Sequence, residues 1–179
     1  MTGFGADPNG AMSKVGTSSA SLGLAPGALG RIKLFAGLKE DQIQQFLGYV
    51  EVVQVPQYSD LVQEGQHGDA MYVVLERELR TLAIIEGKES TLATIGPGEC
   101  FGEISLLDQR PRSADVVANR DTRLLKLSSA AFERLIRESP ALALPFLLAL
   151  SRALVERLRR STKRYEDTIR FIRTSSAAR

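Results

Sequence analysis

The chain has 179 residues, 44% of them hydrophobic, which suits one domain with a single core and appended segments. Its one cysteine, Cys100, and its one histidine, His67, exclude an internal disulfide framework and cannot complete a structural zinc site. The net charge is only +2, and no targeting signal begins the chain. The most apolar stretch, Ala141 to Leu150, is far shorter than the ~20 residues of a membrane helix. We therefore expect a cytoplasmic protein without membrane contact.

The first segment of the chain, residues 1–27, is rich in Gly, Ala and Ser and shows little periodicity. This composition predicts a flexible N-terminal arm. Asp41 to Gly48 follows, with Ile43, Phe46 and Leu47 at helical spacing and acidic residues at its start. We expect a short amphipathic helix there, lying against a β domain.

From Tyr49 onward the hydrophobic period changes to two, which is typical of strands. Short strands are expected at residues 50–55, 61–63, 71–75, 79–85, 91–95, 115–118 and 123–127. Turn-forming residues separate them at even intervals. This spacing predicts a mainly β domain over residues 28–139, an antiparallel sandwich or jelly roll with short flanking helices.

The C-terminal part of the chain has helical periodicity. Ser128 or Ser129 is the expected N-cap of a helix to Glu138, and Ser139-Pro140 then begins a long helix in the segment 140–179. Apolar residues recur there at heptad spacing over about four repeats, which predicts a parallel helix pair across a two-fold homodimer. The alternative is that the helix folds back along its own domain.

This C-terminal helix is also strongly basic. Residues 151–179 hold nine Lys/Arg and three Asp/Glu, a charge of +6, whereas the rest of the chain carries −4. Two interpretations stay open: an attraction to nucleic acid or an acidic partner, and a solvated basic helix face.

The most informative stretch runs from Gly102 to Leu107 and continues at Pro111 to Ala114. Glu103 to Leu107 can form a short helix whose first N–H groups are free, and Pro111 stiffens the chain just before Arg112. A helix start beside a guanidinium favours an anion. The arginine fork matches two oxygens of one phosphate.

The order of strands, glycine-rich loop, anion motif and long helix resembles the cyclic nucleotide-binding domain family, which includes the catabolite activator protein and the regulatory subunits of the cyclic-AMP-dependent kinase. The resemblance extends from about Leu34 to Arg164. Its most specific part is the phosphate-binding cassette, Phe101-Gly102-Glu103-Ile104-Ser105-Leu106-Leu107 followed by Pro111-Arg112-Ser113-Ala114. Supporting matches are Glu64-Gly65, Gly68-Asp69, Met71-Tyr72-Val73-Val74 and Gly96-Pro97-Gly98-Glu99.

The resemblance implies a role for each matched residue of the cassette. Arg112 would pair with the exocyclic phosphate oxygens, and Glu103 would accept a hydrogen bond from the ribose 2′-hydroxyl. Gly102 would let the backbone approach the sugar. The remaining ligand-binding residues implied by the cassette are Ile104, Ser105, Ser113 and Ala114. The alternative for Glu103 and Arg112 is a purely structural ion pair that closes the loop.

Two further features follow from the resemblance. In the family a residue of the long helix covers the base, and counting from the cassette brings Arg157 and Leu158 to that level. The turn between the strands at 71–75 and 79–85 usually contains glycine in the family, but Arg77 takes that place here. Because a left-handed arginine costs roughly 1–2 kcal/mol, we expect a different or a strained turn.

The sequence thus predicts a regulatory module that binds a 3′,5′-cyclic purine nucleotide and relays binding through its C-terminal helix. Serine at position 113 favours cyclic AMP, since threonine there accompanies cyclic GMP in the family. The alternatives are a dimeric scaffold with an empty cassette and a sensor of cyclic GMP or a cyclic dinucleotide. An unidentified protein partner is expected. No enzymatic activity and no cofactor are expected, and the six residues after Arg173 leave no room for a helix-turn-helix, so sequence-specific DNA binding is not expected either.

Overall fold

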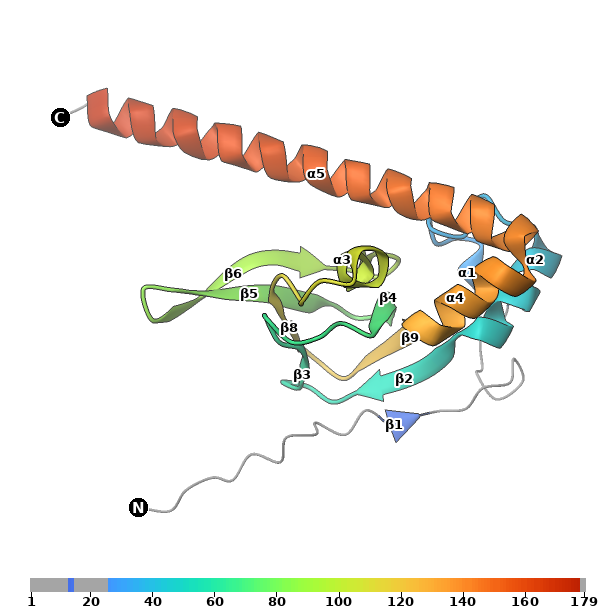
Figure 1. The fold of residues 1–179 in the computed structure, drawn as a ribbon. Helices are drawn as coiled ribbons and strands as arrows, with labels where there is room; N and C mark the ends of the chain where they lie inside the picture. The colour runs from blue at the N-terminus through green and yellow to red at the C-terminus, as the bar shows by residue number, and fades with distance from the viewer. Residues whose placement is uncertain (1–12, 15–25, 178–179) are drawn as a thin grey trace, which may run out of the picture.

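The computed structural model describes residues 13–14 and 26–177, which form two antiparallel sheets and a set of helices (Figure 1). The first sheet has the strand order β1 (Ser13–Lys14), β2 (Glu51–Val55), β9 (Thr122–Ser128), β4 (Ala70–Glu76), β7 (Cys100–Phe101). The second sheet has the order β3 (Asp60–Val62), β8 (Asp115–Ala118), β5 (Leu79–Ile85), β6 (Lys88–Ile95). The predicted antiparallel β-sandwich with a long C-terminal helix is confirmed.

The strand alternation places one apolar cluster between the sheets and a second one under the helices. Val53, Val74, Leu79 and Leu124 are among the buried residues of the first cluster. The second cluster joins the other face of β2, β4 and β9 to the helices, and Phe35, Phe46 and Phe146 lie at its centre. Residues of one strand therefore face two different cores, as the period of two requires.

Most of the expected strands are present, with differences at their ends. The strand expected at 91–95 begins earlier, because Glu86 and Gly87 alone form the turn, both with positive φ, and Lys88 already pairs with Ile85. Such a two-residue turn matches the twist of the flanking strands. The two-residue strands β1 and β7 were not predicted, since segments this short carry no periodicity.

The helices α1 (Pro26–Leu29), α2 (Glu40–Phe46), η1 (Leu47–Tyr49) and α4 (Ser129–Glu138) gather at one end of the sandwich (Figure 1). The Ser128 side chain accepts a hydrogen bond from the Ala131 N–H at 3.2 Å, so Ser128 is the N-cap of α4. Of the predicted arm, Ser13–Lys14 pair with Gln54 and Val53 on β2. Residues 1–12 and 15–25 of that predicted arm lie outside the described residues.

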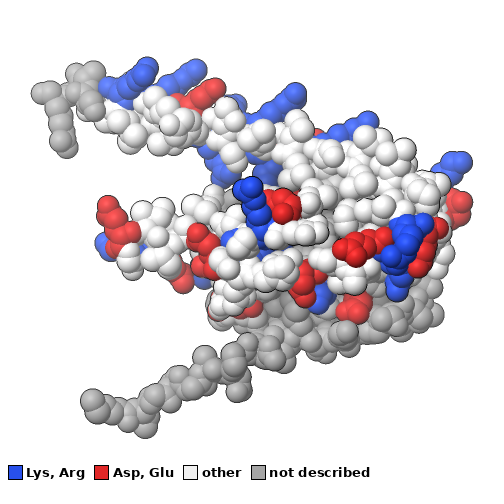
Figure 2. Space-filling view, viewed as in Figure 1, with Lys and Arg blue, Asp and Glu red and all other residues white. Residues whose placement is uncertain are grey.

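The long helix α5 (Pro140–Ala177) packs into the apolar core only at its start. Leu142, Ala143, Phe146 and Leu150 are buried in the helix-covered core, but no residue from 151 to 175 is buried. From there α5 runs past the β5–β6 hairpin (Figure 1), with Lys and Arg side chains along it (Figure 2). A stripe of exposed apolar residues follows the helix: Leu144, Leu148, Val155, Leu158, Tyr165 and Ile172. Its own domain therefore leaves this stripe uncovered. None of the helices in the described part of the chain is long and apolar enough to cross a membrane.

We expected the turn after β4 to have either a different shape or a strained backbone. The structure shows the strained backbone, because Arg77 has a φ of 67°. Replacing Arg77 by glycine should stabilise the protein by about 0.5–1 kcal/mol, since the relief of ~1–2 kcal/mol exceeds the larger entropy of the unfolded glycine chain. Thermal unfolding measures the effect. Glu78→Gly is the matched control and should destabilise the protein, because Glu78 has no positive φ. Equal effects of the two changes would contradict the strain at Arg77.

Candidate ligand-binding site

The cassette is built by a left-handed glycine, a short helix and a loop that returns to it. Gly102 has a φ of 76° and ends β7, so the chain turns directly into α3 (Glu103–Asp108). The loop after α3 is held by an isolated bridge between His67 and Pro111 and by the hydrogen bond from the Arg112 N–H to the Gln66 carbonyl at 2.8 Å. These backbone contacts bring Arg112 back beside the start of α3.

The Arg112 guanidinium lies deep in this arrangement, with the residue only 6% exposed. Its Nη1 donates to the Gly102 carbonyl at 3.1 Å and its Nη2 to the Ala70 carbonyl at 2.8 Å. Burial lowers the pKa of Arg112, whereas the nearby Tyr72, Asp69 and Glu103 side chains raise it. A buried cation that no carboxylate neutralises directly is a good partner for an anionic ligand.

The Glu103 side chain is fully buried at the start of α3, and only one of its oxygens is used. Oε1 lies 2.5 Å from Nη1 of Arg157 on α5, but Oε2 has no hydrogen-bond partner among the described residues. Burial raises the pKa of this carboxyl, and Arg157 and Arg112 oppose the shift. An unpaired buried oxygen costs free energy, so it is a natural acceptor for a ligand hydroxyl.

The interpretation of Glu103 and Arg112 as an ion pair that closes the loop is not supported. The structure pairs Glu103 with Arg157 instead, a residue 54 positions away on the long helix. Arg112 is held by backbone carbonyls. The two charged side chains of the cassette are thus bound separately, and both line the same cavity.

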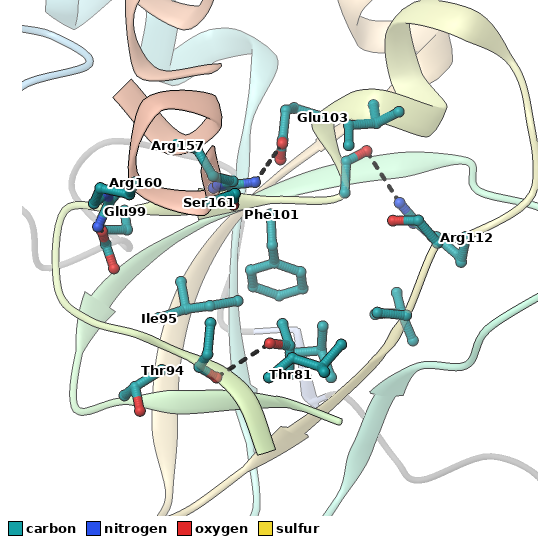
Figure 3. A pocket seen from close by; sticks show the side chains of 18 of the residues that line it. Thr81, Thr94, Ile95, Glu99, Phe101, Glu103, Arg112, Arg157, Arg160 and Ser161 are labelled. Atoms are coloured by element: carbon teal, nitrogen blue, oxygen red, sulfur yellow. Dashed lines mark hydrogen bonds and ion pairs between the residues drawn. The ribbon is translucent and has the colours of Figure 1, made fainter. Parts of the chain in front are cut away.

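A cavity of about 760 Å³ lies between the β5–β8 side of the sandwich, α3 and α5 (Figure 3). This volume is within the range of ~300–1,000 Å³ of small-molecule sites. Eight of the nine predicted site residues line it: Gly102, Glu103, Ile104, Ser105, Arg112, Ser113, Ala114 and Arg157. The ninth, Leu158, is not brought to the cavity, because it lies one position further around α5 and is 67% exposed.

The remaining walls come from residues outside the nine predicted site residues. Thr81, Thr94 and Ile95 line the cavity from β5 and β6, and Phe101 from β7 (Figure 3). Arg160, Ser161 and Arg164 line it from α5. The α5 residues follow Arg157 at spacings of three, four and seven, so the helical period carried a signal for them. For the strand residues, the sequence contains no signal that distinguishes a cavity wall from a core position.

Three arginines hold α5 over the cavity through polar contacts. Besides its contact with Glu103, Arg157 donates to the Cys100 carbonyl. Arg160 pairs with Glu99 at 3.0 Å, and Arg164 donates to the Leu92 carbonyl at 2.9 Å. The Glu99 carboxylate also accepts from the Gly96 N–H at 2.9 Å, which ties this pair to the β6–β7 turn. Since no apolar residue of α5 is buried here, its position depends on these arginines.

Burial raises the pKa of the Cys100 thiol, beside the cassette, to about 12, so the thiol stays protonated and unreactive near neutral pH. No group of three His, Cys, Asp or Glu side chains within the described ranges is placed to hold a metal ion. The chemistry of the cavity is therefore that of one fixed cation, one half-paired carboxylate and an arginine-lined helix.

Comparison with known proteins identifies the class of domain. The family profile described as "Cyclic nucleotide-binding domain" matches residues 52–139. The Cyclic AMP receptor protein of Thermus thermophilus is 40% identical over 124 residues, which cover 69% of this chain and 57% of that protein. The cAMP-dependent protein kinase regulatory subunit of Aspergillus niger is 32% identical over 60% of this chain and 26% of that protein. The chain belongs to the cyclic nucleotide-binding domain family.

A solved structure agrees over a larger share of the chain. A cyclic nucleotide-binding domain from Methylobacillus flagellatus has a TM-score of 0.76 and 28% identity, with 86% of both chains covered. Against the first two curated relatives, by contrast, the chain spans only 57% and 62% of their length. The part that this chain shares with its relatives is a cyclic nucleotide-binding regulatory domain. The further activities of the relatives are described for those proteins and not for this chain.

Proposed function

We propose that this chain is a sensor of a 3′,5′-cyclic purine ribonucleotide, most specifically cyclic AMP, and that it relays binding through α5. The single observation that carries the proposal is the buried Oε2 of Glu103, which has no hydrogen-bond partner among the described residues. It lies in the same cavity as the Arg112 guanidinium. A cyclic ribonucleotide supplies both missing groups, a 2′-hydroxyl donor and a monoanionic phosphate.

The proposed pose follows from these two anchors. The phosphate lies against Arg112 and the hydroxyl of Ser113, and the ribose lies over Gly102 with its 2′-hydroxyl on Glu103. The base then extends toward the walls formed by β5, β6 and α5, where Thr81 and Ser161 offer hydroxyl groups. The choice of cyclic AMP rests on the resemblance at Ser113 and on the printed names of the relatives.

Calorimetric titration with a nucleotide panel tests the ligand class. Cyclic AMP should bind, and 2′-deoxy cyclic AMP should bind at least tenfold more weakly, because it leaves the Glu103 oxygen unpaired. Cyclic GMP and a cyclic dinucleotide are the competing ligands, and 5′-AMP is the control without the cyclic phosphate. Equal affinity for the deoxy analogue would remove the assigned role of Glu103.

A second titration outcome favours the competing function. If none of the cyclic nucleotides binds, and absorbance at 260 nm after denaturation reveals no nucleotide carried through purification, the chain is a dimeric interaction protein with an empty cassette. The absence of tryptophan gives a low protein background for that measurement.

The relay we propose starts at the Glu103–Arg157 pair. A ribose hydroxyl on Glu103 changes the hydrogen bonding of the carboxylate that holds Arg157, and Arg157 fixes the part of α5 that has no buried side chain. Ligand and helix are then coupled, provided that the ligand has different affinities for two positions of α5. This coupling supports an output to an unidentified partner protein.

We further propose that the exposed apolar stripe of α5 pairs with a second copy of the chain. Static light scattering should give twice the mass of one chain, and Leu158→Glu should shift the protein toward the monomer, because it places a charge in the helix–helix contact. Arg159→Glu, one residue away on another side of the helix, is the matched control. A monomeric wild type at micromolar concentration would refute the pairing.

The cytoplasmic location, the lack of sequence-specific DNA binding and the lack of enzymatic activity stay predictions.

A further inference from the structure

A second cavity, of about 1160 Å³, lies next to the nucleotide cavity along α5. Its walls come from residues 29–37, from the end of β4, from the β6–β7 turn and from α5 between Pro145 and Arg160. Arg157 and Arg160 line both cavities. The cassette residues from Gly102 to Ala114 do not line the second one, so it is a separate site.

The walls of this second cavity are mainly apolar. Ile32 and Leu34 contribute from the loop after α1, Leu75 from β4, and Leu148 and Ala153 from α5. Ile32, Leu75 and Ala153 are only partly buried, so apolar surface is open to the cavity. Removing such surface from water stabilises a bound apolar group. The body of a ligand for this cavity is therefore apolar.

The charges around the cavity do not cancel. Its three carboxylates are all paired: Glu76 with Arg123 at 2.8 Å, Glu99 with Arg160 at 3.0 Å, and Glu156 with Lys33 at 3.6 Å. Arg157 is paired with Glu103 of the neighbouring cavity. Two lining cations, Arg31 and Arg152, have no ion-pair partner among the described residues.

These two arginines come from different parts of the chain. Arg31 follows α1 and Arg152 stands on α5, yet both line the same apolar cavity. An anion between them would gain charge-assisted hydrogen bonds. A ribose, by contrast, would find no unpaired carboxylate on these walls, so the site differs in chemistry from the cassette.

We propose that this cavity binds a small amphipathic acid, with its apolar body on the Ile32, Leu75 and Ala153 walls and its carboxylate on Arg31 and Arg152. The proposal does not depend on the identity of the ligand in the cassette. Because Arg157 and Arg160 border both cavities, an acid bound here lies against the same helix segment that covers the nucleotide cavity.

The test uses the full chain with decanoate as the probe, below its micelle concentration, and 1-decanol as the neutral match. By calorimetry, decanoate should bind at least tenfold more tightly than decanol. The double variant Arg31→Gln/Arg152→Gln should weaken decanoate binding at least tenfold and leave decanol binding unchanged. Both arginines are exposed, so the fold should survive, and circular dichroism verifies this.

Two controls separate this cavity from the rest of the surface. Arg159→Gln, on α5 but outside the cavity, should leave decanoate binding unchanged. Ala153→Phe fills the cavity and should weaken acid and alcohol alike. Equal affinity for acid and alcohol, or wild-type decanoate affinity in the double variant or in Ala153→Phe, would overturn the proposal. Cyclic AMP binding, titrated in parallel, reports on the cassette separately.

Discussion

Arg112→Ala should lower the affinity for a cyclic nucleotide by two to three orders of magnitude, or roughly 3–4 kcal/mol. Arg112 is buried and lies in the cavity with two of its N–H groups already directed at the Gly102 and Ala70 carbonyls. Its removal leaves a phosphate anion to be buried without a paired cation. Calorimetric titration of the variant against the wild type measures the loss.

Alanine at this position also removes one hydrogen bond from each of the two carbonyls, so stability falls as well. Arg112→Lys therefore serves as a second variant, since it keeps the charge but loses the fork, and we expect a loss of at least tenfold. Arg110→Ala is the matched control, because Arg110 belongs to the same loop and is exposed. Wild-type affinity in a folded Arg112→Ala protein would remove the phosphate role from this residue.

Gly102→Ala should destabilise the domain by about 3–5 kcal/mol and abolish ligand binding. A Cβ at this position would lie 2.5 Å from Nη1 of Arg112 and 2.8 Å from the Ala70 carbonyl oxygen. Neither atom moves freely, because the two are hydrogen-bonded through the same guanidinium. The steric cost adds to the ~1–2 kcal/mol of a left-handed alanine.

Gly65→Ala measures the cost of a left-handed alanine without the steric cost. Gly65 also has a positive φ, 80°, but a Cβ there meets no atom within 4 Å. We expect a loss of only about 1–2 kcal/mol for this control. Denaturant unfolding and cyclic nucleotide titration of both variants separate backbone strain from displacement of Arg112, and equal losses would show that Arg112 is not displaced.

The sequence specified most of the strands and helices because their signals are local. The heptad-spaced apolar residues of α5, the cap at Ser128 and the cassette each lie within a few residues of one another. Residues that are far apart in the chain but in contact in the fold produce no such local signal. The contact between Glu103 and Arg157 joins two elements that only the folded chain brings together, so the sequence analysis did not predict this pair.

The residues predicted to cover the base, Arg157 and Leu158, show the same limit of sequence analysis within a single helical turn. Counting from the cassette reached the correct turn of α5 but not its rotation. Successive residues of a helix differ by about 100° in direction, so Arg157 lines the cavity and Leu158 is exposed. The rotation of α5 is fixed by the packing of Phe146 and Leu150 in the core, which lies outside the matched motif.

No residue of α5 from 151 to 175 is buried, and polar contacts, mainly those of the three arginines, hold this part of the helix over the cavity. At 1.5 Å per residue, these roughly 25 residues form an arm about 38 Å long. A tilt of about 5° at the core therefore moves the far end by about 3 Å. In the relay proposed above, a shift of one hydrogen bond at Glu103 would be amplified geometrically along α5, without any rearrangement of the sandwich itself.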